Sequence, residues 1–425
     1  MASHDEHSST AIPDVNERDT LGTRAWPVFN GARMVGAIGV IGAVFVGYFV
    51  DPTFKRLFFA YLTSYAFFLS IALGALAFVL LQHLTRAGWS VNVRRVAECL
   101  AATMPILAAL SAPILLAALL NTGALYRWAL PTSELDHVIL AKHAWLNRWF
   151  FCLRILFYFA IWTAIALWYW RRSTEQDRSG EVELTDRMQL RSAPALLVLA
   201  LTITFASFDL LMSLDPHWYS TMYGVYYATG SLLGAFAAIT LVIGLLQHLG
   251  YLTRSVTVEH FHDLGKWLFA FVFFWGYIAF SQYMLMWYAN IPEETVWYSR
   301  RGATTGHGFV SGWSWVSLAL LFGQLLIPFA GLMSKHMKRN YRVLMSWAAW
   351  VLIFHFVDMF WLVMPEMDFD PATSVSRVHF GVVEILCFLG IGGVFLATFM
   401  KLLEKNALRP MKDPRLMESL AFQQV

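Results

Sequence analysis

Five ionisable residues stand inside long apolar stretches of this sequence. They are Arg154, Asp209, His355, Asp358 and Glu384. On insertion scales a charge at the bilayer centre costs about 2.5–3.5 kcal/mol, so each residue needs a partner or a function. If the three carboxyl groups share one cavity, the single guanidinium of Arg154 cannot neutralise all of them. At least one carboxyl must then hold a proton or contact water, as a proton path requires.

A second layer of ionisable residues lies at the predicted starts of two other apolar stretches. Glu98 is at one of them, and His262, Asp263 and Lys266 are at the other. Spacings of three and four place the last three on one helix face, and His262 can exchange protons near neutral pH. Both layers together form a candidate proton path. Each layer also has a structural alternative. The first layer, Arg154 to Glu384, is the outer one and could be an ordinary arginine–carboxylate pair. The second, inner layer could be a hydrated helix start.

The apolar stretches are long enough to cross a membrane. Of the 425 residues, 58% are hydrophobic and 14% are charged, against roughly 45–50% and 25% in soluble domains. The sequence predicts an all-α membrane protein, because the stretches are too long and too continuously apolar for barrel strands. The ten predicted spans are 34–50, 57–82, 96–120, 149–170, 193–213, 220–249, 264–290, 308–334, 343–364 and 378–400.

Charge patterning predicts the orientation of the chain. An even number of spans places both termini on one side, and most of the 31 Lys and Arg residues fall in segments on that side. The positive-inside rule then places the N-terminal segment 1–33 and the tail 401–425 in the cytoplasm, on either side of a membrane domain at 34–400. The first 30 residues lack the pattern of a cleaved signal peptide. The net charge of +3 follows from this anchoring and gives no reason to expect nucleic acid.

The sequence shows no motif for a resident redox centre. Cys99, Cys152 and Cys387 lie in different predicted spans, and neither CxxC nor CxxCH occurs. Iron–sulfur clusters and covalently attached haem therefore have no cysteine ligands here. We expect no covalently bound cofactor, no metal site and no catalytic residue in this chain. Any redox centres would lie on partner subunits.

A pentapeptide recurs at the ends of two spans. LLQHL occupies 80–84 and again 245–249, and the same offset of 165 residues carries Glu98 onto Asp263. Four helices per unit preserve the orientation, so the pattern predicts a parallel repeat. Chance recurrence in a Leu-rich chain is the alternative.

The predicted repeat divides the membrane domain into two four-helix bundles. Spans two to five cover about 57–213, spans six to nine cover about 220–364, and the first and last spans flank them. Asp209 and Asp358 lie at comparable places near the outer ends of spans five and nine, which agrees with a duplication.

Three longer segments carry a resemblance to a known family. They read AKHAWLNRWFFCLRILFYFAIW (141–162), SFDLLMSLDPHWYSTMYGVYYATGS (207–231) and HDLGKWLFAFVFFWGYIAFSQYMLMWYANIPEET (262–295). These segments resemble the NrfD-like membrane subunits of the polysulfide-reductase type. Within that family they are most similar to the F subunits of bacterial alternative complex III, a quinol:electron-acceptor oxidoreductase. The resemblance covers nearly the whole chain outside the first 30 residues.

The resemblance implies a subunit of a respiratory complex in the bacterial inner membrane. The implied partners are a sister NrfD-like quinol-binding subunit, an iron–sulfur subunit, a multi-haem cytochrome c subunit and membrane lipids. Haem c and iron–sulfur clusters would then lie in the partners, and quinol would be oxidised in the sister subunit. This chain would act as a scaffold that also conducts protons.

A docking surface for these partners is predicted at the outer ends of the spans, with an ordinary solvated loop as the alternative. Its predicted residues are Lys142, Asp215, Trp218, Glu293, Glu294, Arg300 and Arg301. Two other functions stay open, a subunit that itself binds quinol and a secondary transporter. Transporters usually break two helices at matched places, and Pro105, Pro113 and Pro328 form no pair at the repeat offset.

Overall fold

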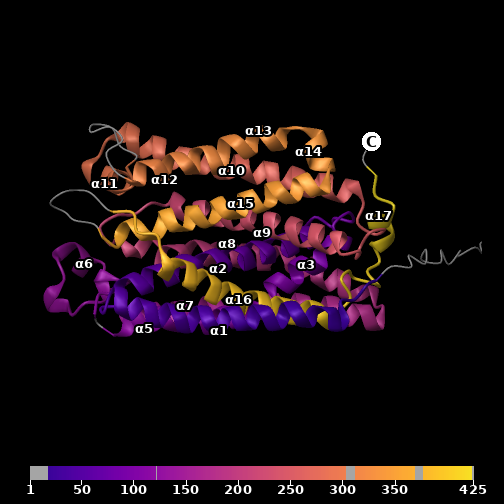
Figure 1. The fold of residues 1–425 in the computed structure, drawn as a ribbon, viewed down its shortest axis with the longest axis horizontal. Helices are drawn as coiled ribbons and strands as arrows, with labels where there is room; N and C mark the ends of the chain where they lie inside the picture. Colours follow the sequence, from indigo (N-terminus) through magenta and orange to yellow (C-terminus); the bar gives the residue numbers. More distant parts are fainter. Residues whose placement is uncertain (1–17, 121, 303–311, 369–376, 424–425) are drawn as a thin grey trace, which may run out of the picture.

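The protein is a bundle of long helices. Its computed structural model describes residues 18–120, 122–302, 312–368 and 377–423, among which no strand occurs. Ten helical segments in these ranges are long and apolar enough to cross a membrane. They run along the long axis of the molecule (Figure 1). The predicted all-α, ten-span membrane protein is therefore confirmed.

The spans follow the predicted order along the chain. Their helices are α1 (Trp26–Val50), α2 (Lys55–Leu84), α3 (Val91–Ala101), α4 (Met104–Leu110), α5 (Ala112–Leu119), α7 (Arg148–Ser179), α8 (Val182–Leu210), α9 (Met222–His248), α10 (Val258–Ala289), α12 (Gly312–Leu320), α13 (Ile327–Met333), α15 (Tyr341–Val363) and α16 (Val382–Glu404). Helices α3, α4 and α5 make up one broken span, and a π-helix at Leu321–Leu326 joins α12 to α13.

Short helices lie between and after the spans. They are α6 (His137–Ala141), α11 (Pro292–Arg300), α14 (Lys335–Arg339) and α17 (Leu416–Leu420). The expected loop at 171–192 is largely absent, because α7 and α8 extend through it and leave only Gly180 and Glu181 between them. Gly180 ends α7 in the left-handed conformation with φ 75°, which glycine adopts without steric cost.

Helix α2 is the most enclosed span, with 94% of its most apolar stretch buried. It packs against α9 so closely that a Cβ at Gly74 would lie 2.0 Å from the carbonyl oxygen of Ser231. Helix α9 also contacts α10 and α15, and α2 contacts α15 and α16. These four helices, α2, α9, α10 and α15, surround the buried acid described below.

The first span docks on the last span through glycines. A Cβ at Gly39 would lie 2.4 Å from the backbone nitrogen of Gly390, and one at Gly393 would lie 2.4 Å from that of Gly36. Small residues let two membrane helices approach until their backbones touch, which gains van der Waals contact where lipid supplies no hydrophobic force. Helix α1 lies along α16 at one edge of the molecule (Figure 1).

Both ends of the described chain meet at one end of the bundle. The Leu408 amide donates to the Asp19 carbonyl oxygen at 2.7 Å, and Arg409 pairs with the Asp19 carboxylate. Arg94 on α3 holds Asp413 of the tail at 2.5 Å. Their position agrees with an even number of spans, which places both ends on one side.

The division into two repeated bundles stays a prediction. Helix α2 contacts α3 and α8 of its own predicted bundle, but it also contacts α9 and α15 of the other one. The packing alone therefore does not separate the two units.

Candidate functional site

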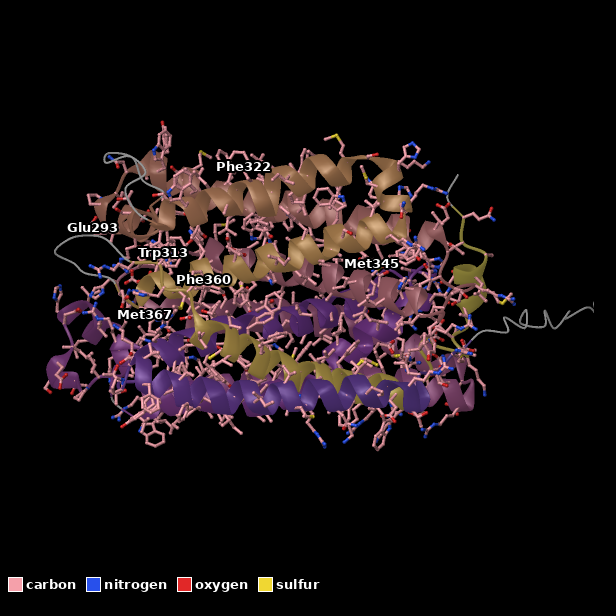
Figure 2. All side chains as sticks on the ribbon, in the orientation of Figure 1. Glu293, Trp313, Phe322, Met345, Phe360 and Met367 are labelled. Carbon is pink, nitrogen blue, oxygen red and sulfur yellow. The ribbon has the colours of Figure 1, made fainter. Side chains whose placement is uncertain are left out.

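Helix α15 carries the buried acid and the buried histidine of the candidate site. Its start is fixed by Asn340, whose side chain accepts from the amides of Arg342 and Val343. His355 and Asp358 follow on one face, three residues apart, and both side chains are fully buried. In Figure 2 the labelled Met345 and Phe360 show the direction of the helix, and Asp358 lies two residues before Phe360.

Two neutral donors hold the Asp358 carboxyl. The Tyr226 hydroxyl on α9 donates to Oδ1 at 2.5 Å, and the Trp275 indole N–H on α10 donates to Oδ2 at 3.1 Å. In the part of the chain that the structure describes, no Lys or Arg forms an ion pair with this carboxyl. Its negative charge, when present, is therefore stabilised by dipoles alone.

His355 is bound through one ring nitrogen only. Its Nε2 lies 2.7 Å from the Ser70 hydroxyl on α2, which also lies 2.7 Å from the Phe67 carbonyl oxygen. Ser70 has a single proton to donate, so the direction of this bond decides which tautomer of His355 is present. The Nδ1 atom has no hydrogen-bond partner within the described residues. Nδ1 is thus the ring atom left to take up or release a proton.

Glycines on α9 leave room beside both groups. A Cβ at Gly230 would lie 3.8 Å from Oδ2 of Asp358 and 3.8 Å from Nδ1 of His355. One turn further on, a Cβ at Gly234 would lie 2.8 Å from the His355 ring, which is too close. The carboxyl and the imidazole therefore border the same small space above Gly230.

Asp209 differs from Asp358 because it has an arginine. Arg154 binds it through two hydrogen bonds of 2.8 and 2.7 Å, and the Tyr158 hydroxyl and the Trp145 indole add bonds of 2.9 and 3.0 Å. The Arg154 guanidinium also lies 4.1 Å from the centre of the Trp145 ring. Asp209 and Arg154 therefore form a buried, hydrogen-bonded ion pair. This is the arginine–carboxylate pair that the sequence offered as the alternative to a proton path.

Glu384 has an arginine of its own. Arg56, in the first turn of α2, binds both its carboxylate oxygens at 2.9 Å, and the Gly381 amide adds a third bond at 2.8 Å. The condition that three acids share Arg154 is therefore not met. The sequence did not reveal Arg56 as the partner because it lies just outside the predicted second span and 328 residues from Glu384.

The two carboxylates of the inner layer, Glu98 and Asp263, also have basic partners. Glu98 lies 3.1 Å from Arg94 and 3.6 Å from Arg95, and Asp263 forms an ion pair with Lys266. His262 precedes Asp263 on α10 and is buried. Within the described ranges, Asp358 has no hydrogen bond to any of these residues. Trp275, which binds Asp358, lies about 18 Å along α10 from Asp263, so the two layers are apart.

Several predicted docking residues are turned into the molecule. Arg300 bridges Asp215 at 2.6 Å and Glu366 at 2.5 Å, and Arg301 is fully buried against Glu366 at 3.0 Å. The Trp218 ring stacks on Trp297 at 4.5 Å. These contacts hold the loops of one end together, and the role of these residues in docking stays a prediction.

The other three docking candidates are more accessible. Glu293 is exposed on α11 (Figure 2), and Glu294 is half-buried beside it. Lys142 donates to the Pro216 carbonyl oxygen at 2.6 Å, and burial lowers the pKa of its ammonium group. The two glutamates remain the best placed for a partner.

Sequence reasoning missed most of the groups that surround Asp358. Tyr226 and Gly230 come from α9 and Trp275 from α10, while Ser70 of α2 contacts His355. The spacing of four between Tyr226, Gly230 and Gly234 is the signal that could have placed these residues on one helix face. Helix packing, which local sequence does not encode, brings them to α15.

Comparisons with known proteins give no identity. No protein-family model matches the chain, and no curated protein matches it. Among the described residues, no group of three His, Cys, Asp or Glu side chains could hold a metal ion.

Proposed function

We propose that the chain is an integral membrane subunit that binds and transfers protons at Asp358, within a quinol-oxidising respiratory complex. One observation carries the proton role. Asp358 is a fully buried carboxyl whose partners are neutral, whereas Asp209, Glu384 and Glu98 each have an arginine. Burial without a compensating cation favours the protonated form, so this carboxyl can store a proton.

The neighbours of Asp358 suit a group that exchanges its proton. Tyr226 and Trp275 donate to the carboxylate, which lowers the cost of removing the proton. His355 offers Nδ1 at the edge of the same space above Gly230. Quinol oxidation must hand protons to bases, so a complex of this kind needs such groups.

The quoted segments support the wider assignment. Their resemblance to the F subunits of alternative complex III favours a sister quinol-binding subunit, an iron–sulfur subunit and a multi-haem cytochrome c as partners. In this proposal haem c and iron–sulfur clusters belong to those partners. The chain lies in the bacterial inner membrane with both termini in the cytoplasm, as the distribution of Lys and Arg favours.

Replacing the buried carboxyl tests the proton role. In the purified complex, Asp358→Asn is expected to reduce the number of protons taken up or released per electron, while subunit composition and the rate of electron transfer are kept. Glu134→Gln, which removes an exposed carboxyl outside the Asp358 site and outside the docking residues, is the matched control and should change nothing. An unchanged proton stoichiometry in the Asp358 variant would contradict the proposed proton role.

Secondary transport is the second candidate, because one span is broken. Helix α4 begins beside Pro105 after a break at Ala102 and Thr103, and α5 begins beside Pro113. The corresponding span of the predicted repeat, α10, is continuous, whereas transporters usually break both. Purification in mild detergent decides between them. Recovery with haem and an iron–sulfur protein supports the respiratory proposal, and recovery alone and colourless supports transport.

A further inference from the structure

A groove of about 780 Å³ opens on the surface between α4 and α7. Pro105 and Ala108 line it from α4, and Ala160 and Ala164 line it from α7. Both alanines of α7 are exposed, so small side chains leave the groove open toward the surrounding membrane. None of the groups in the Asp358 site takes part in it.

The length of the groove matches one leaflet of a bilayer. Its apolar stretch on α7 runs from Leu156 to Leu167, which is about 17 Å at 1.5 Å per residue. Half of a hydrocarbon core of about 30 Å is about 15 Å. The stretch can therefore hold an acyl chain that ends near the bilayer centre.

Basic side chains lie where such a lipid would place its phosphate. Arg171 and Arg172 line the groove one turn beyond Leu167, and Arg191 of α8 lies 4.8 Å from the ring centre of Trp168, which also lines it. Arg172 pairs with Glu175 at 2.5 Å, but Arg171 is exposed and forms no ion pair among the described residues. The end of the groove therefore keeps a positive charge.

We propose that this groove binds one anionic phospholipid from the leaflet on the side of the chain termini. Arg171 and Arg191 bind the phosphate, and one acyl chain lies over Ala160 and Ala164. Guanidinium groups favour phosphate through paired hydrogen bonds, and tryptophan favours the interfacial depth at which Trp168 lies. A zwitterionic lipid would satisfy the apolar stretch but would leave the excess positive charge uncompensated. The proposal is independent of the proton role.

Native mass spectrometry of the purified complex tests the proposal. After delipidation, the sample is titrated with dioleoyl phosphatidylglycerol or with dioleoyl phosphatidylcholine. We expect one tightly bound phosphatidylglycerol per copy of this chain in preference to phosphatidylcholine. The double variant Arg171→Gln/Arg191→Gln should bind phosphatidylglycerol about thirtyfold more weakly, from the usual gain per basic residue at a membrane surface.

Two further variants separate the groove from general surface charge. Ala164→Trp fills the apolar stretch without changing charge and should also lower the occupancy of phosphatidylglycerol. Lys401→Gln removes an exposed basic residue near the C-terminal end of α16, outside the groove, and should leave binding unchanged. Equal binding of the two lipids by the wild-type protein would overturn the proposal. So would recovery of a partner helix or a quinone in the groove in place of lipid.

Discussion

At the residue scale, two aspartates that look alike in the sequence have opposite surroundings. Asp209 accepts four hydrogen bonds, two of them from Arg154, while Asp358 accepts two from neutral side chains. Removing one partner of a buried ion pair leaves the other charge unpaired, whereas a buried carboxyl with neutral partners leaves no charge behind. The two residues should therefore respond differently to the same substitution.

Asp209→Asn is expected to destabilise the folded protein by about 3–5 kcal/mol, because the Arg154 guanidinium stays buried without its counter-charge. Asp358→Asn should cost much less, since an amide oxygen can still accept from Tyr226. Unfolding of both variants in detergent, followed by circular dichroism, measures the difference. Equal losses of stability would contradict the view that the unpaired Arg154 charge makes the Asp209 variant the less stable one.

Gly230→Ala is expected to reduce proton transfer with little effect on stability. The added methyl group would lie at ordinary contact distance, 3.8 Å, from Asp358 Oδ2 and from His355 Nδ1. It would occupy the space that both groups border, so no water could bridge them there. Proton stoichiometry is compared with melting temperature in the same preparation. A normal proton stoichiometry would exclude this space from the path.

At the scale of elements, the contact between α1 and α16 depends on glycine at defined positions. Gly39→Ala would place a methyl group 2.4 Å from the Gly390 backbone, whereas the same change at Gly31, also on α1, meets nothing within 4 Å. We expect the Gly39 variant to release α1 from α16 and the Gly31 variant to behave as wild type. Cysteine cross-linking between the two helices measures their separation. Full cross-linking in the Gly39 variant would contradict this account.

The elements were also the level at which the sequence was most informative. Ten apolar runs predicted ten spans, because a helix that crosses lipid must be apolar along its length. The span predicted at 264–290 also ends where α10 does, at Asn290, which adopts the left-handed conformation with φ 50°. The partners of Glu384 and Asp358 were not visible. They depend on which helices pack together, and local composition does not specify that packing.

At the scale of the whole molecule, the C-terminal tail closes the end that carries both termini. Asp413 is buried, which alone would raise its pKa, but the Arg94 guanidinium at 2.5 Å, together with the amide and charge of Arg415, lowers the pKa from 3.8. Because the pKa is lowered in the folded state, the pair stabilises the docked tail above about pH 4. That contribution is lost as the pH falls through the folded value.

A spin label at Gln423 can follow this docking. Its mobility is expected to be low at pH 7 and to rise on acidification below about pH 4. Asp413→Asn should make the label mobile already at pH 7, while Glu418→Gln, a neighbouring exposed carboxyl, should not. A tail that stays immobile at low pH would show that its other contacts, such as those of Leu416 and Ser419, hold it without the ion pair.

The glycine contact between α1 and α16 joins the first span of the chain to the last. Proteins are synthesised at about 5–20 residues per second, so about 15–70 s pass between the completion of α1 at Val50 and the start of α16 at Val382. During that time α1 lies in the membrane without its main partner. Docking of α1 is therefore a late step of assembly, and a nascent chain truncated before Val382 should leave α1 undocked.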